Sequence, residues 1–402
     1  MKICLANARY SPYVLGGAEL SVQFLAEALL KEGHEVVVLC TAPINGVQKD
    51  IINGVVVYYV GLKNVYWHGS KQNRLFLKTI WHLLDTYNLF MAHAATNIIK
   101  HENPSIIHTN NIAGFSTALW HKTKTMGIPL VHTLRDYHLL CPHAQMYHNG
   151  SNCKTQCKLC KLYSISKRIA SVMPDAVIGI SNYILERHIH YGYFPNAQHL
   201  RVIHNSYWDS KKLPKSMPSK SKPRDNRALR FGYLGRLGEY KGIELLLKAF
   251  HNIPPHLWQL QIGGKGDKQY EIYLKSKYTT GGIQFKGFVK PEEILNSIDI
   301  LIVPSLWQEP LGRTVLEAYA YGVPVIGSNR GGISEIIEDR VTGSIFNPDS
   351  IGSLTRIIES YIDNPSQISD MQIASYNKSK EFYPDVIANK YISLYRSLLL
   401  RE

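Results

Sequence analysis

The stretch that decides the fold runs from Asp299-Ile-Leu-Ile-Val-Pro-Ser305 into Glu309-Pro-Leu-Gly-Arg-Thr-Val-Leu-Glu317. Its first part is a short, apolar, β-branched run, which is typical of a buried parallel strand. Its second part contains good helix formers after Gly312, and Gly322 predicts where that helix ends. The stretch therefore predicts a strand, a loop and a helix, with Glu309 in the loop and Glu317 about one turn inside the helix.

This strand–loop–helix unit also predicts a ligand site. Open α/β sheets bind ligands at the carboxyl ends of their strands, where both glutamates are expected. The first backbone amides of a helix are unpaired donors that suit a phosphate group. Here the residues expected to form that part of the site are Leu311, Gly312, Arg313 and Thr314. Carboxylates beside an anion-binding helix start suit a ligand that carries both hydroxyls and phosphates, such as a nucleotide sugar.

Strands and helices alternate along the rest of the chain, which predicts an α/β fold built from doubly wound parallel sheets. In the first half, strands are expected at Ile3–Ala6, His34–Cys40, Val55–Val60, Ser105–Thr109, Pro129–Thr133 and Asp175–Ser181. In the second half, they are expected at Leu229–Gly235, Leu257–Gly263, Ile283–Phe288, Asp299–Pro304, Val323–Gly327 and Gly343–Phe346.

The composition changes sharply between these halves. Residues 208–228 are rich in proline, serine and lysine and lack apolar periodicity, which predicts an exposed linker. We therefore expect one Rossmann-like domain over 1–207, a basic linker over 208–228 and a second Rossmann-like domain over 229–384. Residues 385–402 form an amphipathic segment and are expected to be a helix.

Two cations occupy the loop Gly235-Arg-Leu-Gly-Glu-Tyr-Lys-Gly242, which is expected to join a strand to the helix Ile243–Phe250. Arg236 and Lys241 would neutralise a diphosphate there. The chain contains no Asp-x-Asp triplet, the carboxylate motif that usually holds a divalent ion on such a diphosphate. These observations predict a site without a catalytic metal. Two glycine-containing loops could approach the nucleotide base through Gly264, Phe288 and Val289.

The 402 residues carry a net charge of +14, and the excess is uneven. Residues 1–207 hold 19 Lys and Arg against 10 Asp and Glu, whereas residues 229–402 hold 19 of each. Such a field favours an anionic partner for the first half, and an anionic membrane ranks first because no nucleic-acid motif accompanies the charge. Solubilising charge is the alternative. No leader or spanning segment is apparent, so a cytoplasmic protein is expected, either free or peripheral at the inner face of the cytoplasmic membrane.

The block Glu309–Glu317, followed by Gly322-Val-Pro-Val-Ile-Gly327 and Gly331-Gly332-Ile-Ser-Glu335, resembles the family 4 retaining glycosyltransferases. Their signature is two glutamates separated by seven residues. The resemblance extends over nearly the whole chain and is stronger in the second half. It implies a GT-B fold, with two Rossmann-like domains facing across a cleft and a C-terminal helix that packs back on the first domain. In such a fold, residues 1–207 would form the acceptor side and residues 229–384 would bind the nucleotide sugar.

The resemblance also assigns roles to residues. It implies that Glu309 contacts the donor sugar, that Glu317 contacts the ribose, and that Arg236 and Lys241 bind phosphate. In the first domain it implies a glycine loop at Gly16 and Gly17 that closes over the donor, and a catalytic histidine at His132, beside Arg135-Asp136-Tyr137. A simple turn at the glycines and a structural role for His132 are the alternatives.

The activity that the resemblance implies is retaining, metal-independent transfer of a hexose from a UDP- or GDP-sugar. The acceptor would be a glycan or a polyprenyl-diphosphate-linked precursor in cell-surface polysaccharide or glycoconjugate synthesis. Two other classes of protein stay open. One is a GT-B nucleotide-sugar epimerase or hydrolase, and the other is a non-catalytic nucleotide-sugar-binding protein.

Four cysteines lie close together in the sequence at Cys141, Cys153, Cys157 and Cys160. Their spacing would allow one structural Zn²⁺ with four thiolate ligands, and His143 and His148 are possible substitutes. Reduced cysteines or disulfides are the alternatives.

Residues 64–100 combine aromatic side chains, among them Tyr66, Trp81 and Phe90, with basic ones such as Lys78. This combination suits either a membrane interface or a buried helix.

Overall fold

The computed structural model describes residues 1–14, 16–67, 74–207, 228–278 and 281–400. These residues fall into two compact units. The first comprises residues 1–146, 154–207 and 384–400, and the second comprises residues 147–153 and 228–383. The expected linker, residues 208–228, lies outside the described residues except for its last residue.

The first unit is built on an eight-stranded sheet with the order β10-β9-β6-β5-β1-β2-β4-β3. Its strands are β1 (Lys2–Ala6), β2 (Glu35–Ala42), β3 (Val47–Ile52), β4 (Val55–Gly61), β5 (Ile106–Thr109), β6 (Leu130–Leu134), β9 (Ala176–Gly179) and β10 (His199–Val202). All neighbours are parallel except the pair β3 and β4.

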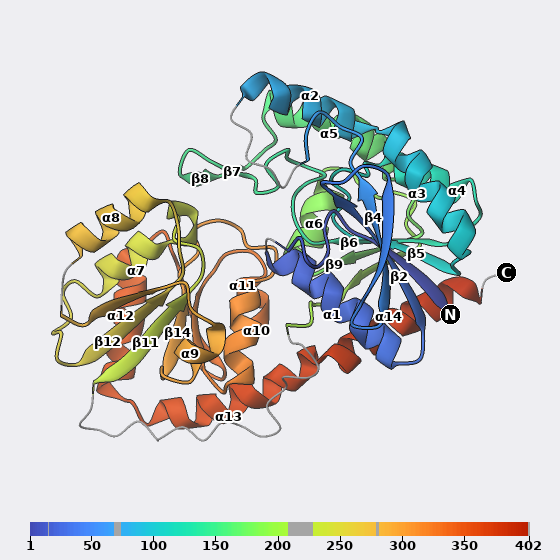
Figure 1. Cartoon of the computed structure of the whole chain (residues 1–402). Coiled ribbons are helices and arrows are strands. Elements are labelled where there is room, and N and C mark those ends of the chain that lie inside the picture. The colour runs from blue at the N-terminus through green and yellow to red at the C-terminus, as the bar shows by residue number, and fades with distance from the viewer. Residues whose placement is uncertain (15, 68–73, 208–227, 279–280, 401–402) are drawn as a thin grey trace. The chain divides into compact units, whose positions relative to one another are not determined.

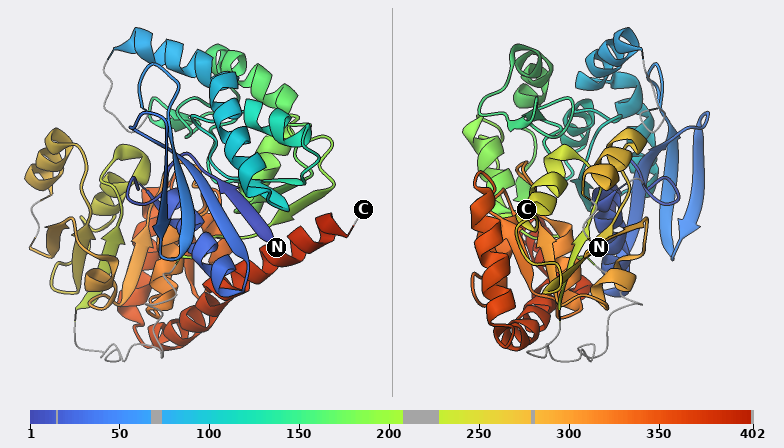
Figure 2. Two further views of the ribbon diagram at one scale, coloured as in Figure 1. Left: turned by 45° about the vertical axis from the view of Figure 1, so that its right-hand side comes forward. Right: turned by 90° about the vertical axis from the view of Figure 1, so that its left-hand side faces the viewer.

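Seven helices of the first unit are α1 (Gly17–Lys31), α2 (Leu75–Thr86), α3 (Leu89–Glu102), α4 (Ala118–Lys124), α5 (Lys158–Ala170), α6 (Asn182–His190) and α14 (Pro384–Leu399). Helices α1 and α14 lie side by side in Figures 1 and 2, and they bury one face of the sheet. Tyr395 of α14 contributes its hydroxyl to a buried hydrogen bond of 2.7 Å with Nδ1 of His108 on β5. A helix far along the chain thus completes this core.

The second unit has a six-stranded, fully parallel sheet with the order β13-β12-β11-β14-β15-β16. Its strands are β11 (Leu229–Leu234), β12 (Trp258–Gly263), β13 (Ile283–Gly287), β14 (Ile300–Val303), β15 (Val325–Ser328) and β16 (Gly343–Phe346). Its helices are α7 (Ile243–Ala249), α8 (Lys268–Lys277), α9 (Pro291–Leu295), α10 (Arg313–Ala320), α11 (Ile333–Ile336), α12 (Ile351–Asp363) and α13 (Gln367–Ser379). A short hairpin, β7 (Tyr147–His148) and β8 (Ser151–Asn152), belongs to the same unit.

Both sheets confirm the expected α/β class with doubly wound parallel strands. The structure adds two edge strands that sequence patterns did not predict, β3 and β10. Side chains on β3 are exposed nearly throughout, and those on β10 are exposed or half-buried. An edge strand without a buried face has no apolar alternation, and this is the signal that predicts strands.

Each sheet contains a point where the strand connections leave in opposite directions. In the first sheet this point lies between β1 and β5, and in the second it lies between β11 and β14. Loops that follow the two flanking strands diverge there and leave a crevice at the carboxyl edge, where open α/β sheets bind ligands. Each of the two crevices is therefore a candidate ligand site.

Candidate functional site

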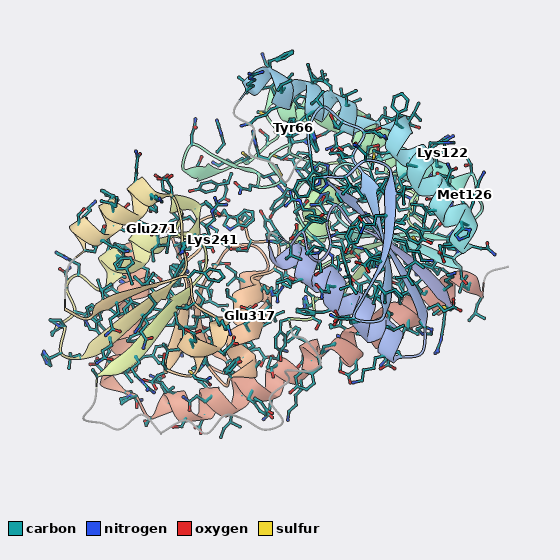
Figure 3. The ribbon with its side chains drawn as sticks, in the orientation of Figure 1. Tyr66, Lys122, Met126, Lys241, Glu271 and Glu317 are labelled. Carbon is teal, nitrogen blue, oxygen red and sulfur yellow. The ribbon has the colours of Figure 1, made fainter. Side chains whose placement is uncertain are left out.

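The crevice of the second unit contains the cation and the carboxylate that the sequence singles out. Lys241 lies in the loop after β11, and Glu309 lies in the loop after β14. The Lys241 ammonium group forms an ion pair with Oε1 of Glu309. Ser305 donates its hydroxyl to the same carboxylate oxygen at 3.0 Å. Figure 3 labels Lys241 in this loop and Glu317 on α10.

Two aromatic rings lie close to the Lys241 ammonium group. Its Nζ lies 5.3 Å from the ring centre of Trp307 and 5.7 Å from that of Tyr240. A cation near aromatic faces is stabilised while it stays available to an anion. Ser305, Trp307 and Tyr240 could not be predicted as site residues from the sequence, since neither a serine nor an aromatic residue next to a motif is a signal by itself.

The Glu309 backbone is fixed by the glycine pair that follows β15. Gly332 donates its amide to the Glu309 carbonyl at 2.8 Å. Gly331 has a φ of 54°, and a Cβ atom built there would lie 2.1 Å from the same carbonyl oxygen. Gln308 accepts the Gly331 amide through its side chain at 2.6 Å. A side chain at position 331 would therefore displace the loop that carries the glutamate.

The hairpin β7–β8 supports the same loop. Asn152 donates its side-chain amide to the Leu306 carbonyl at 2.7 Å and accepts the Gln308 amide at 2.9 Å. These partners are more than 150 residues apart in the chain, so no local pattern could have indicated Asn152.

The loops that follow β11, β12 and β14 pack backbone against backbone. A Cβ atom at Gly264 would lie 1.8 Å from the Gly235 carbonyl oxygen, and one at Gly242 would lie 1.8 Å from that of Pro304. Both positions have φ in the left-handed range, at 145° and 71°. The glycines thus hold the loop of Arg236 and Lys241 against its neighbours on both sides.

Arg236 is exposed at the start of that loop. Phe288, at 79% exposure, and the half-buried Val289 follow β13, the edge strand beyond β12. These residues lie at the carboxyl edge of the sheet, on the β12–β13 side of the crevice.

Helix α10 begins at Arg313, after Gly312 in the left-handed conformation. Leu311 is buried, whereas Arg313 and Thr314 are half-buried at the first turn. Arg313 donates through Nε to Glu317 at 2.9 Å. Burial raises the pKa of the Glu317 carboxyl above its usual value, and Arg313 opposes that shift.

In the first unit, Gly16 and Gly17 are exposed at the start of α1. His132 lies on β6 with a side chain only 2% exposed, its ring centre 4.8 Å from that of Trp120 and 5.9 Å from that of Phe194. Its Nδ1 is 2.9 Å from the Thr109 hydroxyl. Burial lowers the pKa of His132 well below the usual value.

Within its own unit the His132 ring packs against Trp120 and Phe194. The catalytic role of His132 stays a prediction, with the structural role as its alternative. At the carboxyl end of the same strand, Arg135 is also buried and donates to Asn110 and Asn205.

Three of the four clustered cysteines gather at the start of α5. The Cys160 backbone amide donates to the Cys157 sulfur at 3.4 Å. The Cys160 thiol lies close enough to Cys141 and Cys157 to interact with both. Cys153 belongs to the second unit, and within the described ranges no three His, Cys, Asp or Glu side chains are arranged to hold a metal ion. Zinc at this cluster stays a prediction.

The chain matches two models of known families over most of its length. Residues 15–207 match "Glycosyltransferase Family 4", and residues 217–380 match "Glycosyl transferases group 1". An uncharacterized 42.6 kDa protein of the cps region of Klebsiella pneumoniae is 33% identical over 98% of this chain and 100% of its own.

Solved structures support the same fold. Sucrose-phosphate synthase from Thermosynechococcus elongatus is 20% identical, with a TM-score of 0.75 over 100% of both chains. Anabaena HepE in complex with UDP and glucose is 20% identical, with a TM-score of 0.71 over 99% of this chain and 100% of that one. The expected GT-B class of fold is thereby confirmed.

The zinc prediction can be tested on protein purified without chelator. If the cysteine cluster binds zinc, elemental analysis will find about one Zn²⁺ per chain. Cys160→Ser should remove it, whereas Cys40→Ser, at a buried cysteine of β2 outside the cluster, should leave the metal content unchanged. Metal-free and fully active wild-type protein would contradict the zinc prediction.

Proposed function

The chain belongs to glycosyltransferase family 4, and on that basis we propose that it is a retaining hexosyltransferase. It would move a hexose from a nucleotide sugar to a glycan or polyprenyl-diphosphate-linked acceptor. The observation that carries the proposal is the Lys241–Glu309 pair at the crevice of the second sheet. A diphosphate attracts the first of these groups and sugar hydroxyls attract the second.

Each charged group would then have a distinct partner on the donor. Arg236 and Lys241 would bind the diphosphate, together with the amides at the start of α10. A diphosphate would compete with Glu309 for the Lys241 ammonium group, leaving the Glu309 carboxylate free to accept hydroxyls of the sugar. Glu317 would accept hydroxyls of the ribose.

Transfer with retention would proceed on one face of the sugar. The bond between the sugar C1 and the diphosphate oxygen breaks, and the acceptor oxygen bonds to C1 from the same side. The acceptor proton passes to the departing phosphate oxygen. Cations that stabilise the departing diphosphate lower the barrier because its negative charge increases in the transition state.

The comparisons support two finer points. HepE was solved with UDP and glucose, which supports a UDP-sugar donor, with GDP-sugars as the second choice. The Klebsiella relative is named for a cps region, which supports a role in cell-surface polysaccharide synthesis.

Replacing the two glutamates tests the donor assignment. Glu309→Gln should lower kcat/KM about 10²-fold or more, as expected from loss of an electrostatic contact in the transition state. Glu317→Gln should mainly weaken donor binding. The control is Glu359→Gln, at an exposed position on α12. Near-wild-type kcat/KM in both variants would refute the assignment, and equal turnover of the donor without any acceptor would favour a hydrolase.

Metal independence can be tested separately. Because Arg236, Lys241 and the start of α10 supply positive charge for the diphosphate, initial rates should stay within about twofold in EDTA. A rate that requires added Mg²⁺ or Mn²⁺ would contradict this mechanism. The zinc content of the EDTA-treated protein should be measured in parallel, so that loss of a structural ion is not mistaken for loss of a catalytic one.

The acceptor side has a surface that suits a membrane. Helices α2 and α5 contact each other, and they carry exposed apolar side chains at Leu75, Phe76, Leu83, Leu159, Leu162 and Ile169. Lys158, Lys161 and Arg168 lie on α5 among them. Within the described ranges, no helix combines the length and the hydrophobicity needed to span a bilayer.

We propose that this α2–α5 surface rests on an anionic membrane, at the inner face of the cytoplasmic membrane. Wild-type protein should sediment with vesicles that contain anionic phospholipid and be released by salt. Leu162→Ser combined with Ile169→Ser should reduce sedimentation several-fold. Ile272→Ser, at a similarly exposed position on α8, should not. Equal binding to neutral and anionic vesicles would contradict the proposal that positive charge attracts this surface to anionic lipid.

A further inference from the structure

We infer that the first unit recognises an acidic group on the acceptor, in a pocket that contains Arg9 and Lys78. The inference rests on the proposed function, because it names the class of molecule that would receive the sugar. The pocket has a volume of about 450 Å³. Among the residues that line it are Arg9, Tyr66, Lys78, Trp81, Asn111 and His143.

This pocket lies at the crevice of the first sheet. Arg9 follows β1 and Asn111 follows β5, the two strands that flank the change of direction. The two loops are tied together, since Ala8 donates its amide to the Asn111 carbonyl at 2.6 Å and Asn111 donates its amide to the Asn7 side chain at 3.1 Å. A bound group would therefore meet a preformed surface at the place where such sheets bind ligands.

The charged side chains in the pocket lining are basic. Its described lining includes Arg9 and Lys78 and contains no carboxylate. The Arg9 guanidinium is held in place, with one nitrogen 3.8 Å from Glu19 and its carbon atom 5.8 Å from the ring centre of Trp67. Lys78, on α2, is exposed at the rim.

Two carboxylates lie behind the pocket wall, and each accepts a backbone amide. Asp136 accepts the Asn111 side-chain amide at 2.6 Å and the His138 backbone amide at 2.7 Å. Asp85 accepts the Gly114 amide at 2.6 Å and lies 3.4 Å from the His138 ring. Lys167 is buried there as a further cation, 3.0 Å from the His138 carbonyl oxygen. Both carboxylates are thus engaged within the unit, and neither lines the pocket.

One side of the pocket is aromatic. Tyr66, labelled in Figure 3, is half-buried, and its ring centre lies 6.1 Å from that of Trp81 on α2. Trp81 donates its indole N–H to the Tyr66 carbonyl at 3.0 Å, which holds the pair together. An aromatic ring beside cations suits a sugar ring that carries an anionic group, because apolar C–H faces of the sugar pack on the aromatic ring.

Two kinds of acceptor carry an anion next to a sugar ring and would fit this pocket. One source of the anion is the diphosphate of a lipid-linked sugar, and the other is the carboxylate of a uronic acid. The probes are decyl diphosphate-linked glucose, decyl β-glucuronide and neutral decyl β-glucoside. Their affinities would be measured by calorimetry below their micelle-forming concentrations.

At least one acidic probe should bind about tenfold or more tightly than the neutral glucoside, as expected of a charge-assisted contact. Lys78→Gln and Arg9→Gln should each reduce that preference severalfold. Lys100→Gln, at an exposed lysine of α3 outside the pocket, should preserve it. Tighter binding of the diphosphate or of the glucuronide would identify the source.

Equal affinity for all three probes would overturn the inference, as would an acid preference that both Lys78→Gln and Arg9→Gln preserve. UDP-glucose binding, measured on the same samples, keeps the two proposals apart. It should be unchanged in both variants, since neither residue belongs to the donor site. If the wild-type protein binds acidic probes but no UDP- or GDP-sugar, the proposed function fails while the anion pocket stands.

Discussion

The parallel order of β11 and β14 is the constraint on which the rest of the second unit depends. These strands are neighbours, yet their following loops turn to opposite sides of the sheet. The loops leave a crevice between them, and the Lys241–Glu309 ion pair joins one side of it to the other. The pair forms because this strand order places the loop after β11 beside the loop after β14.

Close contact between backbones then fixes the loops within that frame. Gly242, Gly264 and Gly331 each lie against a carbonyl oxygen of a neighbouring loop. A Cβ atom at any of these positions would collide with that oxygen. Such contacts leave little freedom to the groups that would hold a phosphate or a sugar. Rigid placement of charges matters in catalysis because charges that are already oriented need no reorganisation during the reaction.

Much of this could be predicted from the sequence, because buried parallel strands and glycine-bounded helices have strong local signals. The strand and helix around Glu309 and Glu317 are examples. Edge strands β3 and β10 could not be predicted, since they lack a buried face. Asn152 could not be found because its role depends on partners more than 150 residues away. The strand that carries His132 could be predicted, whereas its ring contacts could not, because Trp120 lies on the preceding helix and Phe194 lies 62 residues further along the chain.

The packing of α14 has a consequence for how the protein is made. The core of the first unit includes Ile387, Tyr391 and Tyr395. Residues 1–207 therefore cannot complete this core during synthesis until the whole second unit has been translated. At the usual speed of translation, about 5–20 residues per second, that delay lasts on the order of ten seconds or more. Until then, the strands and α1 expose an apolar face that other chains could bind. Molecular chaperones should therefore matter more for the first unit than for the second, whose core is formed by nearly continuous sequence.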